Sequence, residues 1–414
     1  MFVRIDNTPR DYAWGSRSAI AAFRGRPESG APEAELWLGA HAGSPARLTD
    51  GTSVGHADLA EWIAADPVAT LGAELAGESE PRLPFLLKLL AAGGPLSLQA
   101  HPTPEQARAG YAREDADGIA LDAYDRNYKD RFHKPELIVA ISDRFDALSG
   151  FRPLDEVHAV VQVLRDADAA SPTPEPGALD LLEAPLGGQW PLADTVEWLL
   201  RDGRGGDTGE ASWVIERVVA LSGSEVAAAT SYADSFATVL ALAEAYPGDP
   251  GLVISLLLNR VRLGRGEALY LAAGNIHAYL DGLGIELMAA SDNVLRGGLT
   301  PKHIDVSELL EVLDFTPMPA PRLEPERPLP GVEVFRPVVP DFVLYRIEAT
   351  SADAPRIELA GPAIVLAEGG DVWLEGENGV GSLARGEALF ITPDEAEIAV
   401  TGPGIAWIAT TGRG

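Results

Sequence analysis

The sequence predicts a mainly β protein with an all-helical insertion. Residues 95–102 alternate apolar and polar side chains with the period of a β-strand, whereas residues 154–263 place apolar residues at helical spacing. The pattern RGEALYL at 265–271 recurs as RGEALFI at 385–391. This near repeat indicates two β domains of related type, one of which is interrupted by the helices.

The first informative strands lie between residues 84 and 102. The apolar run 84–90 is interrupted by Lys88, so we expect a strand or buried segment whose ammonium group either snorkels out to solvent or faces a polar cavity. A glycine turn leads into the alternating strand, which ends at Pro102, and Thr103 opens a helix. The polar face of the alternating strand carries Ser97, Gln99 and His101. A lone histidine on a strand face is usually structural, so this strand alone does not identify a site.

Two further strands begin beside charged or aromatic residues. Lys134 and Glu136 precede a β-type run at 137–141 with shared strand parity, so their side chains are expected close together. After 265–271 a glycine turn leads to His277, with Tyr279 at the same parity. The second copy of the repeat has no histidine after it, so only the first keeps a possible metal ligand.

The remaining segments suggest loops and a linker. Residues 285–302 are dense in polar, charged and glycine residues without regular periodicity, as in loops that carry function. The proline-rich stretch 317–330 is typical of an interdomain linker. Short strands and turns continue to residue 414, as expected for a β-sandwich or jelly roll.

Composition limits the class of partner. The net charge of −30 argues against nucleic acid and requires a local basic pocket for any phosphate-bearing substrate. No apolar run approaches membrane-span length and the N-terminus has no secretory pattern, so we expect a cytoplasmic protein without membrane contact. Because there is no cysteine, a metal ion would need histidine, carboxylate or amide ligands. Few of the 32 basic residues are lysines: Lys88, Lys129, Lys134 and Lys302.

Four side chains from separate segments could together bind a metal. Two imidazoles, a carboxylate and an amide oxygen suit Zn²⁺ or a similar divalent ion. The candidates are Gln99, His101, Glu136 and His277. From spacing alone, a metal site and purely structural roles for these four residues are equally well supported.

Several segments resemble signatures of the type I mannose-6-phosphate isomerase family, in the order expected of it. The closest are PLSLQAHP at 95–102, HKPEL at 133–137 and SDNVLRGGLTPK at 291–302. Further similar segments lie at 12–15, 34–37 and 83–88. Two departures concern local geometry only, since Ile276 replaces a frequent proline and Gly297 a more usual alanine. The helical and C-terminal parts are similar in position and length alone.

The resemblance implies three domains. Residues 1–152 and 261–317 would form a cupin-type jelly-roll catalytic domain, 153–260 an inserted helical domain, and 318–414 a second jelly roll. It also implies one Zn²⁺ per chain bound by Gln99, His101, Glu136 and His277, and an essential arginine at Arg296. We expect a monomer whose only partner is a small-molecule sugar phosphate.

The implied reaction interconverts mannose 6-phosphate and fructose 6-phosphate through a cis-enediol. Arg296, a permanent cation, could hold the enediolate oxygens. His133 and Asp292 are equal candidates for the general acid/base. The phosphate and cavity candidates are Lys88, Lys134, Lys302, Ser97, Tyr279 and Trp14.

Two other classes compete with this interpretation. Two histidines and a carboxylate also occur in Fe(II) cupin dioxygenases, although a glutamine ligand would occupy a position that oxygen chemistry needs open. A noncatalytic sugar-phosphate sensor could share the scaffold, but it would have no need of four intact ligand positions.

Overall fold

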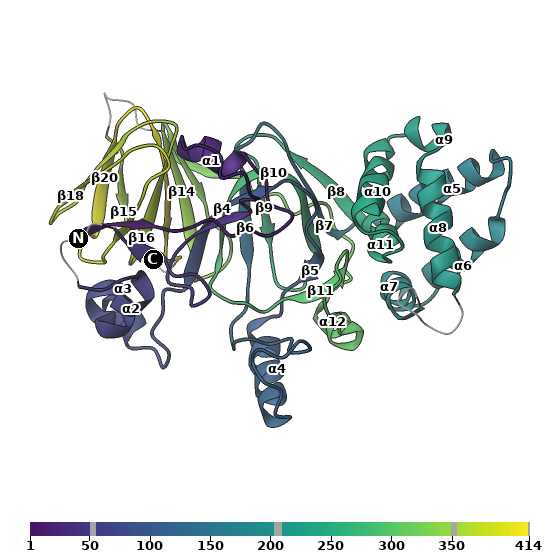
Figure 1. Cartoon of the computed structure of the whole chain (residues 1–414), viewed down its shortest axis with the longest axis horizontal. Coiled ribbons are helices and arrows are strands. Elements are labelled where there is room, and N and C mark those ends of the chain that lie inside the picture. Colours follow the sequence, from purple (N-terminus) through teal and green to yellow (C-terminus); the bar gives the residue numbers. More distant parts are fainter. Residues whose placement is uncertain (50–54, 203–208, 349–353, 413–414) are drawn as a thin grey trace.

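The computed structural model describes residues 1–49, 55–202, 209–348 and 354–412. It confirms a mostly β chain with a separate helical block (Figure 1). The helical block lies at one end of the molecule, the C-terminal strands lie at the other, and a central sheet lies between them. No helix in these ranges is long and apolar enough to cross a membrane.

The central sheet has nine strands in the described chain. Its main path runs β11-β5-β10-β4-β2, while β6 pairs with β10 and β9, and β7 pairs with β10 and β8. The strands are β2 (Glu35–Leu38), β4 (Phe85–Ala92), β5 (Leu98–Ala100), β6 (Glu136–Ala140), β7 (Phe145–Phe151), β8 (Leu258–Leu263), β9 (Ala268–Leu271), β10 (His277–Ala289) and β11 (Leu295–Gly298). The strands expected around residues 84–102, 137–141 and 265–271 are confirmed.

Strand β10 organises this sheet because its two halves have different partners. Its first residues pair with β5 and β7, and its second half pairs with β4 and β6. The register shifts between Tyr279 and Asp281, where β10 carries one more residue than β7. Such a bulge exchanges the faces on which odd and even residues point. His277 and Tyr279 can therefore share a face with Glu286, although the numbers differ in parity.

The helical block interrupts the sheet between two paired strands, β7 and β8. Its helices are α5 (Leu154–Ala169), α6 (Pro176–Leu186), α7 (Pro191–Asp202), α8 (Glu210–Ser222), α9 (Glu225–Ala228), α10 (Ala233–Ala245) and α11 (Gly251–Leu257). Their leucines and valines form one buried cluster. The helical pattern was expected to reach residue 263, but 258–263 form β8 because they return to pair with β7.

The other helices lie outside this block: α1 (Ala19–Arg24), α2 (Leu59–Ala65), α3 (Pro67–Ala76), α4 (Pro104–Ala116) and α12 (Val306–Val312). The helix start expected at Thr103 is confirmed by a capping box. The Thr103 hydroxyl accepts from the Gln106 amide, and the Gln106 side chain accepts in return from the Thr103 amide. Strand β5 and α4 therefore follow one another directly, with His101 between them.

The C-terminal part forms an eight-stranded sheet, β12-β13-β14-β21-β16-β19-β1-β3, and a four-stranded sheet, β15-β20-β17-β18. The eight-stranded sheet contains β1 (Phe2–Asp6), β3 (Arg47–Leu48), β12 (Glu326–Leu329), β13 (Val332–Phe335), β14 (Val343–Glu348), β16 (Ala363–Glu368), β19 (Ala388–Ile391) and β21 (Ile405–Thr410). The smaller one contains β15 (Arg356–Glu358), β17 (Val372–Glu375), β18 (Val380–Leu383) and β20 (Glu397–Thr401). Both copies of the sequence repeat form strands, β9 and β19.

The N-terminal strand corrects the expected domain boundaries. Residues 1–152 were assigned to the catalytic domain, but β1 pairs with β19 and β3 in the C-terminal sheet. The expected linker 317–330 likewise contains β12. Strand pairing between distant segments decides both placements, and sequence order does not reveal it.

Asp146 on β7 joins the central sheet to the strand that returns from the helices. Its buried carboxylate contacts Arg260 at 2.7 Å, Arg262 at 3.2 Å and Arg144. Burial alone would raise the pKa of Asp146, but hydrogen bonds from Arg260 and Arg144 lower it below its usual value. We expect Asp146→Asn to reduce the free energy of unfolding by about 3 kcal/mol, because the partly buried guanidinium of Arg260 loses its buried countercharge.

This effect should depend on pH. A carboxylate whose folded-state pKa is lowered stabilises the protein fully at neutral pH, and the stabilisation is lost as the pH falls through that pKa. Denaturant unfolding of both proteins at pH 7 and in acid should show the difference narrowing in acid. The control, Asp143→Asn, makes the same charge change at an exposed position and should alter stability by less than about 0.5 kcal/mol. Equal stability of Asp146→Asn and the wild-type protein at pH 7 would contradict the assignment.

Candidate metal centre and cavity

Three buried side chains from different segments converge in the central sheet. His101 follows β5, Glu136 begins β6 and His277 begins β10, and each is at most 1% exposed. Their potential ligand atoms all lie within 4.8 Å of one another. His101 Nε2 is 3.3 Å from one carboxylate oxygen of Glu136, and His277 Nε2 is 3.2 Å from the other.

Hydrogen bonds orient both imidazoles toward this point. His101 Nδ1 lies 2.8 Å from the Asn293 carbonyl, and His277 Nδ1 lies 3.0 Å from the Asn275 carbonyl. When each Nδ1–H donates to its carbonyl, each Nε2 keeps a free lone pair, the arrangement typical of histidines that bind metals. Asn293 and Asn275 were not among the predicted residues, because a backbone acceptor has no signature in the sequence.

The charge states suit a cation. Burial lowers the pKa of His101 to about 4, and the nearby Lys134 ammonium adds to the effect, so this imidazole is neutral at pH 7. Burial alone would raise the pKa of Glu136, but Lys134 and the imidazoles lower it well below its usual range. A carboxylate between imidazoles is a typical zinc ligand set.

The hydrogen bonds of these three side chains show whether they fit a metal ion. Within the described ranges, His101 Nε2, Glu136 Oε2 and His277 Nε2 are buried and have no hydrogen-bond partner. Orphaned buried polar atoms are rare and costly, and three that converge on one point are accounted for by a bound cation. The residues present therefore fit Zn²⁺.

The strand register places Gln99, the fourth predicted ligand, and Arg296, the predicted arginine, in line with His277. Gln99 on β5 lies opposite His277 on β10 and, on its other side, opposite Arg296 on β11. Residues directly opposite in neighbouring strands project on the same face of a sheet. His277, Gln99 and Arg296 therefore form a row across three strands, and this row was not apparent from their separation in sequence.

A second charged cluster lies beside the metal site. Lys88 on β4 is 5% exposed, 2.8 Å from Glu286 Oε2 and 3.7 Å from Glu35 Oε1. Burial lowers the pKa of Lys88, but these carboxylates and Glu136 outweigh it and raise the pKa above its usual value. Glu286 and Glu35 were missed from sequence, although the buried charge expected at Lys88 was itself a signal that a carboxylate partner was needed.

The combined charge of both clusters favours a divalent ion. Lys134 Nζ lies 2.8 Å from Glu136, so three buried carboxylates face two ammonium groups. With all three carboxylates ionised, these five side chains have one net negative charge. A bound Zn²⁺ would change this to one net positive charge in a buried place, which favours an anionic ligand.

A cavity of about 440 Å³ opens beside these groups. Most of the predicted site residues line it: Trp14, Lys88, Ser97, Gln99, Lys134, Glu136, Tyr279, Asp292, Arg296 and Lys302. Burial and the carboxylates of Glu286 and Glu136 raise the pKa of Tyr279, so its hydroxyl remains a potential donor. The helical block, in which no chemistry was expected, contributes Tyr246 to the wall.

His133 lies apart from the cavity lining, and its role as a general acid/base stays a prediction. It is not among the described residues that line the cavity, and its Nε2 lies 2.8 Å from Asp341 in the C-terminal part. The strand that begins at Glu136 directs Glu136 inward, while His133 pairs with the neighbouring domain. Asp292, the other candidate, lines the cavity and lies 3.3 Å from His41.

Two cations in the cavity have no carboxylate partner among the described residues. Lys88 and Lys134 are neutralised by glutamates, whereas no ion pair involves Arg296 or Lys302 within the described ranges. Burial lowers the pKa of Lys302, and the nearby Arg296 contributes to this shift. In a chain of net charge −30, two adjacent cations without a countercharge indicate a site for an anionic ligand.

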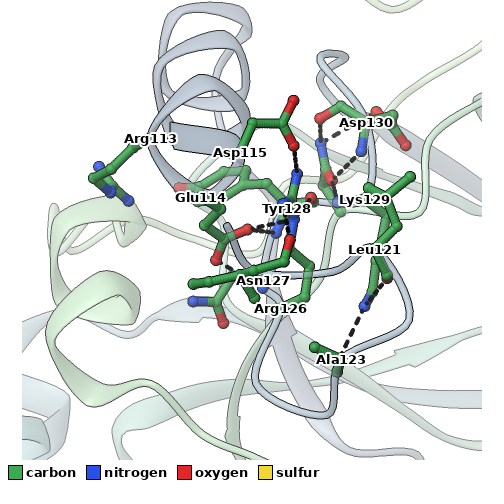
Figure 2. A network of polar contacts seen from close by, with 12 residues as sticks. Arg113, Glu114, Asp115, Leu121, Ala123, Arg126, Asn127, Tyr128, Lys129 and Asp130 are labelled. Atoms are coloured by element: carbon green, nitrogen blue, oxygen red, sulfur yellow. Dashed lines mark hydrogen bonds and ion pairs between the residues drawn. The ribbon is translucent and has the colours of Figure 1, made fainter. Parts of the chain in front are cut away.

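The loop that leads from α4 to Glu136 is held by a polar network (Figure 2). The Glu114 carboxylate accepts from the Asn127 and Tyr128 amides at 2.9 and 2.8 Å, and pairs with the buried Arg126 at 2.9 Å. Lys129 Nζ donates to the Leu121 carbonyl at 2.7 Å. Lys129, the lysine that was not among the predicted site residues, therefore has a structural role.

Asn293 connects this loop to the metal cluster. Its side chain accepts from the Lys129 amide at 2.7 Å and donates to the Phe132 carbonyl at 2.8 Å, while its own carbonyl meets His101. The loop carrying Lys134 and Glu136 is consequently fixed relative to His101.

Comparison with known proteins agrees with this geometry. Residues 2–154 match a model described as phosphomannose isomerase type I, catalytic domain. A mannose-6-phosphate isomerase of Escherichia coli strain K12 is 35% identical over 402 residues, covering 97% of each chain. That of Rattus norvegicus is 32% identical over 410 residues, covering 93% of this chain and 92% of the relative.

Solved structures are similar over nearly the whole chain. A mutant phosphomannose isomerase from Salmonella typhimurium superposes with a TM-score of 0.86 at 33% identity, covering 99% of both chains. A zinc-bound mannose 6-phosphate isomerase gives a TM-score of 0.85 at 33% identity, also over 99% of both. With this similarity in sequence and fold, and a His-Glu-His cluster that fits zinc, the chain belongs to the type I phosphomannose isomerase family.

Proposed function

We propose that this protein interconverts D-mannose 6-phosphate and D-fructose 6-phosphate, with zinc bound by Gln99, His101, Glu136 and His277. The observation that carries the proposal is that a cluster fit for zinc, whose Glu136 lines the cavity, lies beside two cavity cations that have no carboxylate partner in the described chain. The two cations would bind the phosphate of an anionic sugar. A metal ion in the cluster would act on the carbonyl end of the same sugar. Family membership favours this activity over oxygenation or ligand sensing.

The substrate would lie with its phosphate toward Lys302. This ammonium lines the cavity and has no countercharge among the described residues, and Ser97 on the cavity wall supplies a hydroxyl donor. Lys88 and Lys134 are less suited to the phosphate, because glutamates already neutralise them. Their role is to balance the buried carboxylates and donate to sugar oxygens. Trp14 and Tyr279 complete the wall.

The isomerisation moves one proton between C2 and C1 of the open-chain sugar. Removal of the C2 proton of mannose 6-phosphate leaves a cis-enediolate with its negative charge on O1. A proton passes from the O2 hydroxyl to O1, and return of the first proton to C1 gives fructose 6-phosphate. Asp292 is the candidate base because its carboxylate lines the cavity. Burial alone would raise the pKa of Asp292, but His41 lowers it below its usual value. Arg296 would hold the enediolate oxygens with two parallel donors. When bound, zinc supplies Lewis-acid stabilisation of the charge at these oxygens.

The finer architecture follows from the same family. The central sheet and the C-terminal sheets would be two cupin-type jelly rolls, with the helical block inserted in the first. Cytoplasmic location and a monomeric state stay predictions.

An isomerase assay before and after chelation tests the proposal. Purified protein with one zinc per chain should convert mannose 6-phosphate to fructose 6-phosphate, and chelator should abolish the conversion until zinc is restored. Thermal melting should show the chelated protein to be less stable, since the ion binds only the folded state. Binding of the sugar phosphate without turnover would support a sensor instead, and turnover unaffected by complete zinc removal would overturn the metal's role.

A further inference from the structure

The cavity wall contains an unusual backbone conformation. Leu299 has φ of 54°, and it is the single non-glycine residue with positive φ in the described ranges. Steric contact of Cβ with the backbone disfavours this left-handed region for a leucine by about ten-fold or more in population. Such residues persist only where the surroundings hold them, and they cluster at functional sites.

Leu299 lies in the turn between Arg296 and Lys302. It directly follows β11, which carries Arg296 opposite Gln99, and it precedes the segment that ends at Lys302. Leu299, Thr300, Pro301 and Lys302 all line the cavity. The conformation of Leu299 therefore sets the direction in which the chain runs from the metal cluster to Lys302.

One side chain of the helical block holds this turn. Asp249 Oδ1 accepts from the Leu299 amide at 2.8 Å and from the Gly251 amide, at the start of α11, at 2.7 Å. The packing here is tight, since a Cβ on Gly298 would lie 2.9 Å from Gly251 Cα and 3.0 Å from Asp249 Oδ1. Glycine at 298 permits this approach, and Leu299 itself is fully buried against the helix.

We propose that Asp249 is a positioning residue that keeps Leu299 in its left-handed conformation and thereby directs the Thr300–Lys302 segment into the cavity. The helical block then contributes to catalysis, because it holds the 299–302 loop of the active site in place from outside the central sheet. The expected effect on turnover rests on the proposed function, in which Lys302 contacts the substrate phosphate. The backbone restraint itself does not depend on that function.

A rescue experiment tests this role. Asp249→Ala should lower kcat/KM for mannose 6-phosphate by about ten-fold, with zinc content unchanged, because the loop loses its anchor. Asp249→Asn keeps an oxygen acceptor and should stay within about two-fold of wild type. Leu299→Gly removes a fully buried side chain, so this variant is the reference for the double variant. Asp249→Ala should lower kcat/KM by about ten-fold in the wild-type background and by less than about two-fold in the Leu299→Gly background, since glycine adopts positive φ without an external restraint.

Helix capping is the competing explanation, and Asp249→Ser separates the two. The serine hydroxyl suits a local turn at Gly251 but is shorter than the carboxylate that also meets Leu299. Activity of Asp249→Ser close to wild type, or failure of the Leu299→Gly rescue, would overturn the proposal. If Asp249→Ala does not fold, the serine and asparagine variants give the same comparison.

A substrate-free measurement distinguishes this proposal from the proposed function. Amide hydrogen exchange at Leu299 should be slow in the wild-type protein and at least ten-fold faster in Asp249→Ser, whether or not the protein is an isomerase. Equal exchange in the two proteins overturns the restraint. Absence of isomerase activity with slow wild-type and faster variant exchange would overturn only the proposed function.

Discussion

Replacing His277 with alanine is expected to remove zinc and, with it, the isomerase activity. The imidazole is buried, and its Nε2 lies 3.2 Å from Glu136 and has no hydrogen-bond partner among the residues that the structure describes. Loss of an outer hydrogen-bond partner of a metal ligand lowers metal affinity by about 10- to 100-fold, so loss of the ligand itself should exceed 100-fold. Elemental analysis after dialysis measures the zinc content, and turnover should fall in proportion.

The matched control is His158→Ala, which removes an exposed histidine in α5 and should keep one zinc per chain. Gln99→Ala extends the test to the neutral ligand, whose loss should weaken zinc binding less than loss of an imidazole. Full zinc retention in His277→Ala would contradict the ligand assignment.

Replacing Arg296 with alanine is expected to lower kcat/KM by about 10²- to 10³-fold while zinc stays bound. The guanidinium lines the cavity, lies opposite Gln99 in the strand register, and has no carboxylate partner in the described chain. Donors preorganised for developing negative charge typically contribute this much to turnover. Steady-state kinetics with mannose 6-phosphate and elemental analysis of the same samples measure both quantities.

Two further variants sharpen this prediction. Arg296→Lys keeps the charge but loses the paired donors, so its activity should lie between those of the wild-type protein and Arg296→Ala. Arg108→Ala removes an exposed arginine from α4 and should leave activity unchanged. Unaltered turnover in Arg296→Ala would exclude a catalytic role, and loss of zinc would indicate a structural one.

Much of the site was accessible from local patterns. Strand alternation placed Gln99 on the same strand face as His101, and an ammonium inside an apolar run required Lys88 either to reach solvent or to face a polar cavity. The structure brings these residues together with Glu136 and His277, and a row across three strands adds Arg296.

Other features depend on contacts that no local pattern contains. Glu286 differs in parity from His277, and only the bulge after Tyr279 brings both to one face. His133 stands three residues before Glu136, yet it pairs with Asp341 of the C-terminal part. The first strand likewise joins a sheet formed by the last hundred residues.

The sequence by itself determined the division into strands and helices and the chemical groups available, because periodicity and residue type are local properties. Only the tertiary structure decided which cations are free. Lys88 and Lys134 have glutamate partners, one of them 198 residues away, whereas Arg296 and Lys302 have none within the described ranges. Charge compensation depends on distances of a few ångströms between segments that only folding brings together.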